Sequence, residues 1–295
     1  MIIDSLQLNL PVDFPRNAVL RSARPFVKWV GGKQQLLSQF EEYFPTTFRR
    51  YFEPFVGGGA VFFRLWNTHR LPKQTFLFDN NAELVNAYLV VRDKIDELME
   101  TLAFHKKRHD KKYYYKVRGL DRKELKLSDV ERAARVIYLN RTCYNGLYRV
   151  NSRGQFNVPM GSYINPQILH ADVLQAASAS LQGVNIELRD FRSIVDFAQA
   201  EDLFYFDPPY DPLSKTASFT GYTSDSFGEE DQRELARVFA RLAEKGAFVM
   251  LSNSNTPLIL ELYRKFRIET VRAKRAVNSD ANGRGFIQEV VVLNY

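Results

Sequence analysis

Short apolar runs alternate with helical stretches along most of this chain, and this pattern predicts an α/β fold. The runs typical of strands cover residues 50–56, 75–78, 184–188, 203–206 and 247–251. Apolar residues recur at helical spacing in 60–66, 84–102, 128–141, 229–245 and 257–265. Strands separated by helices favour a mostly parallel sheet. The final runs, 267–277 and 286–293, predict a C-terminal antiparallel hairpin.

The alternation stops between residues 91 and 181, which predicts an inserted, mainly helical domain. Within it, residues 105–126 hold ten Lys or Arg against three Asp or Glu, and residues 144–163 are polar and rich in Gly and Asn. We therefore expect a catalytic domain made of 25–90 and 182–295. The inserted domain would span 91–181, with a β-hairpin loop near 144–163. Residues 1–24 would form an N-terminal extension.

Composition narrows the class of protein. The net charge of +7 indicates a polyanionic partner, although a solvated basic surface would give the same charge. Cys143 is the only cysteine, which excludes an internal disulfide and fits a reducing cytoplasm. Because no apolar stretch is long enough to span a membrane and no signal peptide is recognisable, we expect a soluble cytoplasmic protein without membrane association.

Two histidines have a spacing that could form a metal site. His105 and His109 lie four residues apart and could share a metal on one helix face. They are embedded among lysines and have no acidic or thiol partner nearby. We therefore predict that both are surface residues and that the protein needs no metal.

A rigid polar turn closes the strand-like run 203–206 and has the sequence Asp207-Pro208-Pro209-Tyr210. Open α/β sheets hold their chemistry at such strand ends. The prolines fix φ and lack an N–H group, so the carboxylate and the carbonyls form a stiff set of acceptors beside an aromatic ring. This set suits a planar substrate that carries an amino group. For the turn alone, a plain loop is the alternative.

A second turn follows the first strand-like run and has the sequence Glu53-Pro54-Phe55-Val56-Gly57-Gly58-Gly59. Its glycines let a ligand approach the backbone, and Asp79, twenty residues after Gly59, lies where a ribose diol would be bound. NAD would fit the same geometry, although the full G-x-G-x-x-G spacing is absent. Helix–strand packing alone would also explain the glycines. In Gly31-Gly32-Lys33, Val27 replaces the first glycine of a P-loop, which argues against ATP.

Several segments in one order carry a resemblance to a known family: Phe26 to Lys33, Glu53 to Gly59, Asp79, Asp190-Phe191 and Asp207 to Tyr210. They resemble the Dam family of DNA adenine-N6 methyltransferases, which methylate GATC with S-adenosylmethionine. The similarity extends from Phe26 to the chain end, and residues 144–149 and 154–163 resemble the target-recognition hairpin of that family. The resemblance implies a Rossmann-like methyltransferase sheet, double-stranded DNA as substrate, and S-adenosylhomocysteine as product.

Cofactor roles follow from the resemblance. Trp29 and Lys33 would close over S-adenosylmethionine, and the glycine turn would approach its methionine moiety. Asp79 would take the ribose hydroxyls, and Asp190 with Phe191 would bind the adenine end. The full expected set is Trp29, Lys33, Glu53, Pro54, Phe55, Gly57, Gly58, Gly59, Asp79, Asp190, Phe191 and Asp207.

Adenine N6 is a poor nucleophile because its lone pair is delocalised into the ring. We expect Asp207 and the Pro208 carbonyl to accept its two N–H groups and so aim the lone pair at the methyl group. Tyr210 would stack on the base, which must be flipped out of the duplex. The expected catalytic residues are Asp207, Pro208, Pro209 and Tyr210.

The inserted domain is expected to supply sequence specificity. Arg149 has the donors for bidentate contact with guanine, while Leu147 and Pro159 can meet a thymine methyl or pack locally. The resemblance further assigns four DNA contacts: Lys28 to the first guanine, Tyr144 as a wedge beside the flipped base, Asn145 at the disrupted pair, and Tyr163 on the DNA side. Basic residues in 106–126 are expected to contact phosphates, with some merely solvated.

Two other functions compete with this prediction. Methylation of cytosine N4 or of a glutamine amide would suit the same acceptors. The resemblance of residues 144–149 and 154–163 to the target-recognition hairpin argues against both. A relative that binds DNA without catalysis is the second alternative. A monomer can methylate one strand of a palindrome at a time, so we expect a monomer. The sequence leaves open a restriction endonuclease counterpart, processivity, preference for hemimethylated sites and flanking-sequence bias.

Overall fold

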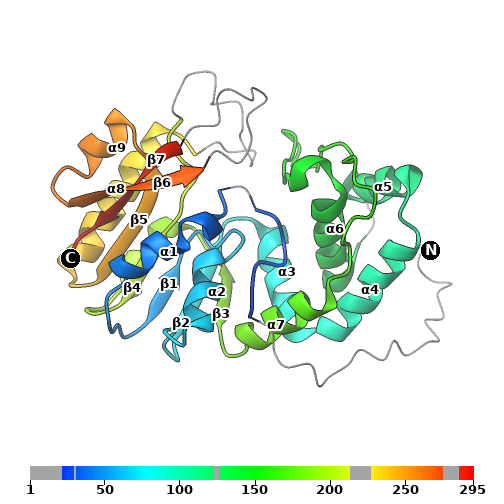
Figure 1. The fold of residues 1–295 in the computed structure, drawn as a ribbon, viewed down its shortest axis with the longest axis horizontal. Helices are drawn as coiled ribbons and strands as arrows, with labels where there is room; N and C mark the ends of the chain where they lie inside the picture. Colours follow the sequence, from blue (N-terminus) through cyan, green and yellow to red (C-terminus); the bar gives the residue numbers. More distant parts are fainter. Residues whose placement is uncertain (1–21, 30, 123–125, 213–226, 275–285) are drawn as a thin grey trace.

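The computed structural model describes residues 22–29, 31–122, 126–212, 227–274 and 286–295. Most of the expected N-terminal extension, Val30, Lys123 and the predicted strand end 275–277 lie outside these described residues. Figure 1 shows a β-sheet covered by helices and, beside it, a group of helices that includes α4, α5 and α6. Over the described part of the chain, no helix combines the length and the apolar character needed to cross a membrane.

The sheet has seven strands in the order β3-β2-β1-β4-β5-β7-β6. The strands are β1 (Tyr51–Glu53), β2 (Thr75–Asp79), β3 (Asn185–Leu188), β4 (Leu203–Phe206), β5 (Phe248–Ser254), β6 (Arg267–Lys274) and β7 (Phe286–Leu293). Strands β1 to β5 pair in parallel, whereas β7 is antiparallel to β5 and to β6. The predicted Rossmann-like sheet and its C-terminal hairpin are confirmed. Strand order reverses between β1 and β4, the point at which such sheets bind ligands.

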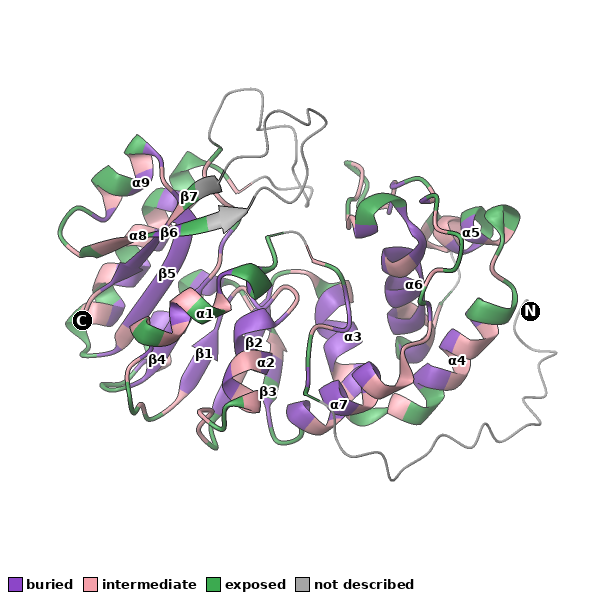
Figure 2. Ribbon diagram, in the orientation of Figure 1, coloured by how far each residue is buried: buried purple, intermediate pink, exposed green. Residues whose placement is uncertain are grey.

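The central strands are buried on both faces, as expected for parallel strands covered by helices. All four residues of β4 are buried, and Figure 2 shows the buried colour along β1 and β5. Phe52 stacks between Phe76 and Phe204, with ring centroids 4.5 Å apart on each side. This aromatic layer belongs to the core under η5 (Phe191–Phe197), α8 (Glu229–Glu244) and α9 (Pro257–Leu262). It fixes the register of β1 and β4, whose ends form the switch point.

The opposite face of the sheet is covered by elements from the first half of the chain. These are η1 (Lys33–Gln35), α1 (Leu37–Phe40), η2 (Glu41–Tyr43), α2 (Ala60–Asn67) and α3 (Ala82–Asp93). Helix α2 begins directly after the glycine turn and buries Val61, Phe62 and Phe63. The core on this side continues into the inserted region. The glycine turn is therefore held between a buried strand and a buried helix.

Between β2 and β3 the chain forms a helical group. It contains α4 (Ile95–Lys107), α5 (Lys111–Arg118), η3 (Gly119–Arg122), α6 (Asp129–Thr142), η4 (Tyr144–Gly146) and α7 (Ala171–Leu181). The single helix predicted over 84–102 is wrong, because the chain leaves helical geometry at Lys94 (φ −136°, ψ 43°) and divides into α3 and α4. Apolar spacing continues across this break, so periodicity alone could not reveal it. Helix α6 is buried along most of its length (Figure 2).

The prediction of two surface histidines is wrong for His105. This side chain is buried, its Nδ1 lies 2.8 Å from the Tyr113 hydroxyl, and its ring stacks on Tyr138. Burial lowers the pKa of His105 to about 4, so the ring is neutral at physiological pH. His109 is half-buried, with Nδ1 2.9 Å from the Tyr138 hydroxyl. Aromatic neighbours from α5 and α6 thus override the local lysine-rich context.

Candidate active site and DNA-recognition segment

Asp207 follows β4 at the switch point and forms an ion pair with Lys33. The Lys33 Nζ lies 2.9 Å from Asp207 Oδ1 and donates to the Gly31 carbonyl over 2.7 Å. It also lies 4.3 Å from the centroid of the Tyr210 ring. Lys33 is only 3% exposed, so its ammonium is held almost entirely by these groups. The structure therefore brings three of the predicted site residues into direct contact.

Two opposing effects act on the Asp207 carboxyl. Burial raises its pKa above the ordinary value, while the Lys33 ammonium and hydrogen bonds from Lys33 and Ser252 lower it. The Ser252 hydroxyl lies 3.1 Å from Asp207 Oδ1 and 3.0 Å from the Tyr205 hydroxyl. Ser252 and Tyr205 are fully buried. This polar chain behind Asp207 fixes one carboxyl oxygen and favours the ionised form.

The remainder of the turn at 207–210 is held by residues that the sequence analysis did not single out. Tyr210 donates its hydroxyl hydrogen to Glu289 on β7 over 2.7 Å. Gln232 on α8 donates to the Pro209 carbonyl over 2.9 Å, and Asn253 on β5 accepts from the Asp211 N–H over 3.2 Å. Polar residues 252–254 at the end of a buried strand are a signal that could have indicated such a role.

Close contacts within the protein explain why glycines stand at positions 57 and 59 of the glycine turn. Gly57 and Gly59 have φ of +48° and +71°, where a side chain is disfavoured. A Cβ on Gly57 would lie 2.8 Å from the Trp29 ring, and one on Gly59 would lie 2.6 Å from the Tyr88 hydroxyl. The packing alternative considered for these glycines is therefore supported by direct contacts. Trp29 covers the turn and also stacks on Tyr148, with ring centroids 5.3 Å apart.

Asp79 ends β2 beside this turn and is buried. One carboxyl oxygen accepts from the Gly57 N–H over 3.1 Å, and the other accepts from the Asn81 N–H over 2.9 Å. Burial raises its pKa to about 6, against the opposing effect of these N–H donors. A carboxylate has about four acceptor positions, so it can still accept from hydroxyl groups.

Glu53, the last residue of β1, is also buried and accepts from the Tyr51 hydroxyl over 2.8 Å. Burial, reinforced by the nearby charge of Asp207, raises its pKa to about 8. The carboxyl is therefore largely protonated at neutral pH. Glu53 thus adds a hydrogen-bonding group, rather than a second full negative charge, to the strand ends.

Aromatic side chains form the other side of the strand-end region. The Phe55 and Phe191 ring centroids are 5.3 Å apart, and both rings contact Phe227. Asp190 begins η5 and accepts from the Arg192 N–H, and its other carboxyl oxygen pairs with the Arg192 guanidinium at 2.8 Å. Phe191 is thus positioned as an apolar surface, whereas the Asp190 carboxylate already has partners within the protein.

The predicted DNA-contacting residues lie on one segment and on its neighbour Lys28. Tyr144, Asn145, Arg149 and Pro159 are exposed, and the Tyr144 side chain is 54% exposed despite its size. Leu147 is half-buried and packs against the core, in agreement with the local-packing alternative. The two sides of the segment are paired by two isolated antiparallel bridges, Cys143 to Met160 and Val150 to Phe156, and not by continuous strands.

Asn140 connects this segment to the N-terminal motif. Its side chain accepts from the Lys28 N–H and donates to the Lys28 carbonyl, each over 2.7 Å, and it also donates to the Gly146 carbonyl over 2.8 Å. The exposed Lys28 side chain lies over the Tyr163 ring, with Nζ 4.7 Å from the centroid. The predicted contacts Lys28 and Tyr163 are therefore neighbours, although 135 residues separate them.

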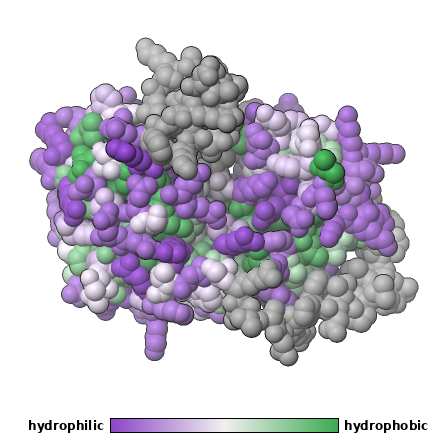
Figure 3. Space-filling model, viewed as in Figure 1, coloured by the Kyte–Doolittle hydropathy of each residue, from purple (hydrophilic) through white to green (hydrophobic). Residues whose placement is uncertain are grey.

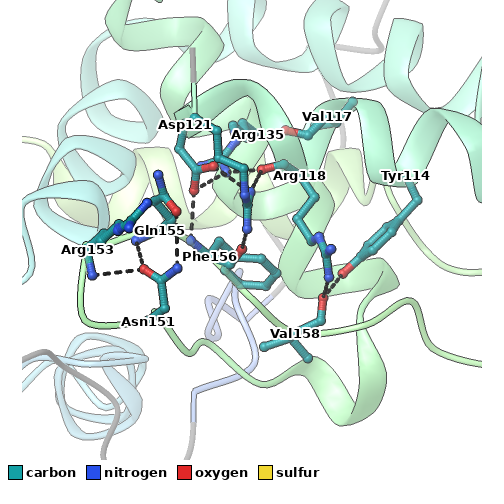
Figure 4. Close-up of polar contacts among 11 residues, drawn as sticks. Tyr114, Val117, Arg118, Asp121, Arg135, Asn151, Arg153, Gln155, Phe156 and Val158 are labelled. Atoms are coloured by element: carbon teal, nitrogen blue, oxygen red, sulfur yellow. Dashed lines mark hydrogen bonds and ion pairs between the residues drawn. The ribbon is translucent and has the colours of Figure 1, made fainter. Parts of the chain in front are cut away.

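Side chains of η3 and α6 brace the same segment (Figure 4). Asp121 accepts from the Phe156 N–H over 2.7 Å and pairs with the buried Arg135 at 2.7 Å. Arg122 donates to the Phe156 carbonyl, and Arg118 donates to the Val158 carbonyl. Two arginines of the region predicted to contact phosphates thus hold the predicted recognition segment, residues 144–163. Exposed lysines on α5 are Lys111, Lys112 and Lys116.

Comparison with known proteins identifies the family. The family model for D12 class N6 adenine-specific DNA methyltransferases matches residues 29–277. The chain belongs to this family. It is a DNA adenine methyltransferase, and membership implies DNA as substrate and use of S-adenosylmethionine. Within the described residues, no group of three His, Cys, Asp or Glu is arranged to hold a metal ion.

Individual relatives cover nearly the whole methyltransferase. The type II methyltransferase M1.LlaDCHI of Lactococcus lactis subsp. cremoris is 45% identical over 276 residues, which cover 92% of this chain and 95% of the relative. M.MjaIII of Methanocaldococcus jannaschii, also a type II methyltransferase, is 42% identical and covers 92% of this chain and 99% of its own. The DNA adenine methylase of Escherichia coli strain K12 is 33% identical over 276 residues, which cover 93% of this chain and 96% of the relative.

Proposed function

We propose that this methyltransferase modifies adenine N6 in double-stranded GATC. The observation that carries the proposal is the contact of Lys33 with both Asp207 and Tyr210 at the switch point. The Lys33 ammonium contacts a carboxylate and an aromatic ring face. These are the two groups that could bind the amino group and the ring of an amino-bearing base. The exposed recognition segment, tied to the N-terminal motif by Asn140, supports DNA as the partner.

The strand ends suit S-adenosylmethionine in the chemistry of their donors and acceptors. Asp79 offers a buried carboxylate for a ribose diol, and Phe55 and Phe191 offer apolar ring faces for adenine. Glu53, the turn 57–59, Trp29 and Lys33 surround the same region. When bound, S-adenosylmethionine supplies a methyl group already activated by its sulfonium charge. We assign its binding to these residues.

Residues of the turn at 207–210 orient the target amine for methyl transfer. Asp207, whose ionised form is favoured by the hydrogen bond from Ser252, accepts one N–H of the target base, and the Pro208 carbonyl accepts the other. These two acceptors hold the nitrogen so that its lone pair faces away from the ring plane. Tyr210, fixed by Glu289, stacks on the base. Because the Lys33 ammonium occupies both Asp207 and Tyr210, entry of the base displaces it.

Recognition of the site would come from the segment at 144–163. Arg149 presents its guanidinium to guanine, oriented by a hydrogen bond from Nε to Asn157 over 2.7 Å. Pro159 is exposed for a thymine methyl, and Tyr144 fills the space that a flipped base leaves. Lys28 and Tyr163 contact the adjoining DNA. We propose base flipping because the acceptors lie at a strand end, and a base stacked in a duplex would have to leave the stack to reach them.

One methyl transfer needs one such site, so we propose that a monomer acts on each strand in turn. The two type II methyltransferases are more similar to this chain than the E. coli DNA adenine methylase. On this ranking we propose a type II role, with a restriction endonuclease for the same site as its counterpart.

The proposal is tested by incubating purified protein with plasmid and S-adenosylmethionine and mapping methylation at base resolution. N6-methyladenine confined to GATC is the expected result. N6-methyladenine at another sequence would overturn the assigned specificity, and N4-methylcytosine would favour the alternative acceptor. An Asp207→Asn variant should lose at least about 100-fold in rate while retaining DNA binding. Full turnover by that variant would refute the assigned catalytic site.

A further inference from the structure

The two proline carbonyls of the turn at 207–210 differ in availability. The Pro209 carbonyl accepts a hydrogen bond from Gln232 Nε2 over 2.9 Å. Gln232 lies on α8 and is 1% exposed. Among the described residues, none donates a hydrogen bond to the Pro208 carbonyl. Within the described residues, the Pro209 carbonyl is thus occupied and the Pro208 carbonyl has no protein donor.

Backbone groups determine which way the Gln232 amide faces. Asn253 is fully buried, and its Oδ1 accepts from the backbone N–H groups of Asp211 (3.2 Å) and Ser254 (2.8 Å). Because these donors cannot be exchanged for acceptors, Asn253 must present its Nδ2 elsewhere. It donates to Gln232 Oε1 over 3.0 Å. The Gln232 amide nitrogen is left facing the Pro209 carbonyl.

Two buried amides, Gln232 on α8 and Asn253 on β5, therefore hold the turn that follows β4. We propose that Gln232 and Asn253 are positioning residues for methyl transfer. They hold the Pro209 carbonyl away from the substrate and so present the Pro208 carbonyl, with Asp207, to the target amine. The inference rests on the proposed role of the 207–210 turn. An acceptor displaced by about 1 Å can cost roughly 100-fold in rate even when binding is unchanged.

The test compares two substitutions at Gln232 by single-turnover methylation at saturating DNA and S-adenosylmethionine. Gln232→Met removes the donor, and we expect a rate about 100-fold lower at every pH. The affinities for DNA and for S-adenosylhomocysteine should stay within about twofold, because Gln232 touches neither in this proposal. A Gln232→Met rate within about threefold of the wild type would overturn the inference.

Gln232→Glu gives a signature that a purely structural role would not produce. When protonated, its carboxyl can donate to the Pro209 carbonyl and accept from Asn253; when ionised, it repels that carbonyl. The ratio of its rate to that of the wild type should therefore rise as the pH falls from about 8.5 to about 6. A ratio independent of pH contradicts the proposal. If Gln232→Met does not fold, this pH dependence and the parallel behaviour of Asn253→Asp still decide the question.

Two control variants distinguish a failure of the positioning role from a failure of the proposed catalytic turn. Gln182 donates to the Arg92 carbonyl over 2.8 Å at the end of α7, so Gln182→Met removes the same kind of hydrogen bond far from the site. Its rate should equal that of the wild type. Asp207→Asn is measured in parallel. An inactive Asp207→Asn with an active Gln232→Met refutes only the positioning role, whereas an active Asp207→Asn refutes the proposed catalytic turn itself.

Discussion

The ion pair between Lys33 and Asp207 places a lysine where the target amine is proposed to bind. Both residues are largely withdrawn from solvent, with side-chain exposures of 4% and 21%. An unpaired carboxylate in such a place is costly, and the ammonium favours the ionised form of Asp207 against burial, which raises its pKa. Under the proposed mechanism the pair has two roles: it favours the ionised acceptor, and it opens when the base enters.

Replacing Lys33 by Met should change the pH dependence of methylation. Without the ammonium, burial raises the Asp207 pKa further, so protonation abolishes the acceptor at a higher pH than in the wild type. We expect the rate to fall by about tenfold near pH 6.5 and to recover towards pH 8.5. Single-turnover rates measured across this range, with cofactor affinity recorded at each pH, test this. An unchanged acid limb would contradict it.

Glu53 predicts a pH effect on stability. Its pKa is raised from 4.5 to about 8, so the native protein binds a proton that the unfolded chain has released. Between these values the unfolded state binds fewer protons, and the free energy of unfolding falls as pH rises. Glu53→Gln should reduce this decrease, and part of the remainder comes from buried Asp79, whose pKa is also raised, to about 6. Urea unfolding without cofactor at about pH 5 and pH 8.5 measures it. The exposed Glu244→Gln should keep the wild-type slope.

The recognition segment shows how a stretch with little regular secondary structure becomes rigid. Two isolated bridges join its sides, and its carbonyls and N–H groups are met by Tyr114, Arg118, Asp121 and Arg122 (Figure 4). These partners come from α5 and η3. A loop held in this way loses little further conformational entropy when it binds DNA. The proposed DNA specificity would then depend on helices that need not touch a base.

Asp121→Asn should weaken this brace. The change leaves the buried Arg135 guanidinium without its counterion, and we expect a loss of about 2 kcal/mol in the free energy of unfolding. The preference for GATC over sites with one altered base should decline, while affinity for S-adenosylhomocysteine is retained. Asp129→Asn is the matched control, because its 62% exposed side chain pairs with Arg132 only at 3.5 Å. Equal effects of both substitutions would contradict the role of the brace.

Charge is distributed over the molecule rather than confined to the active site. The formal net charge is +7, and Figure 3 shows hydrophilic side chains over most of the visible face. Helix α5 carries exposed lysines and also contacts the recognition segment through Tyr114, whose hydroxyl donates to the Val158 carbonyl over 2.9 Å. Phosphate contacts beside this segment would add affinity without reading sequence. The same contacts would make binding sensitive to salt.

A triple substitution tests this distribution of charge. Changing Lys111, Lys112 and Lys116 to Gln should lower the slope of log affinity against log salt concentration by roughly 2 to 3, if each lysine meets a phosphate. Changing Arg233, Arg237 and Arg241 on α8 to Gln removes the same charge from another helix and should leave the slope nearly unchanged. DNA-binding isotherms at several salt concentrations distinguish local contacts from an effect of net charge. Equal slopes for the two variants would refute a local role for α5.

Local sequence patterns were sufficient to predict the individual strands, the strand-end turns and the family resemblance, because each of these is carried by short runs of residues. Apolar runs predict β1, β2 and β4, and the two prolines fix φ at their own positions in the turn at 207–210. These patterns could not show the break at Lys94, across which apolar spacing continues, or the burial of His105, which stacks on Tyr138 from another helix. Only the tertiary structure joined Gln232 to Pro209 and Asn140 to Lys28. A buried amide takes its partner from packing, and no local pattern names that partner.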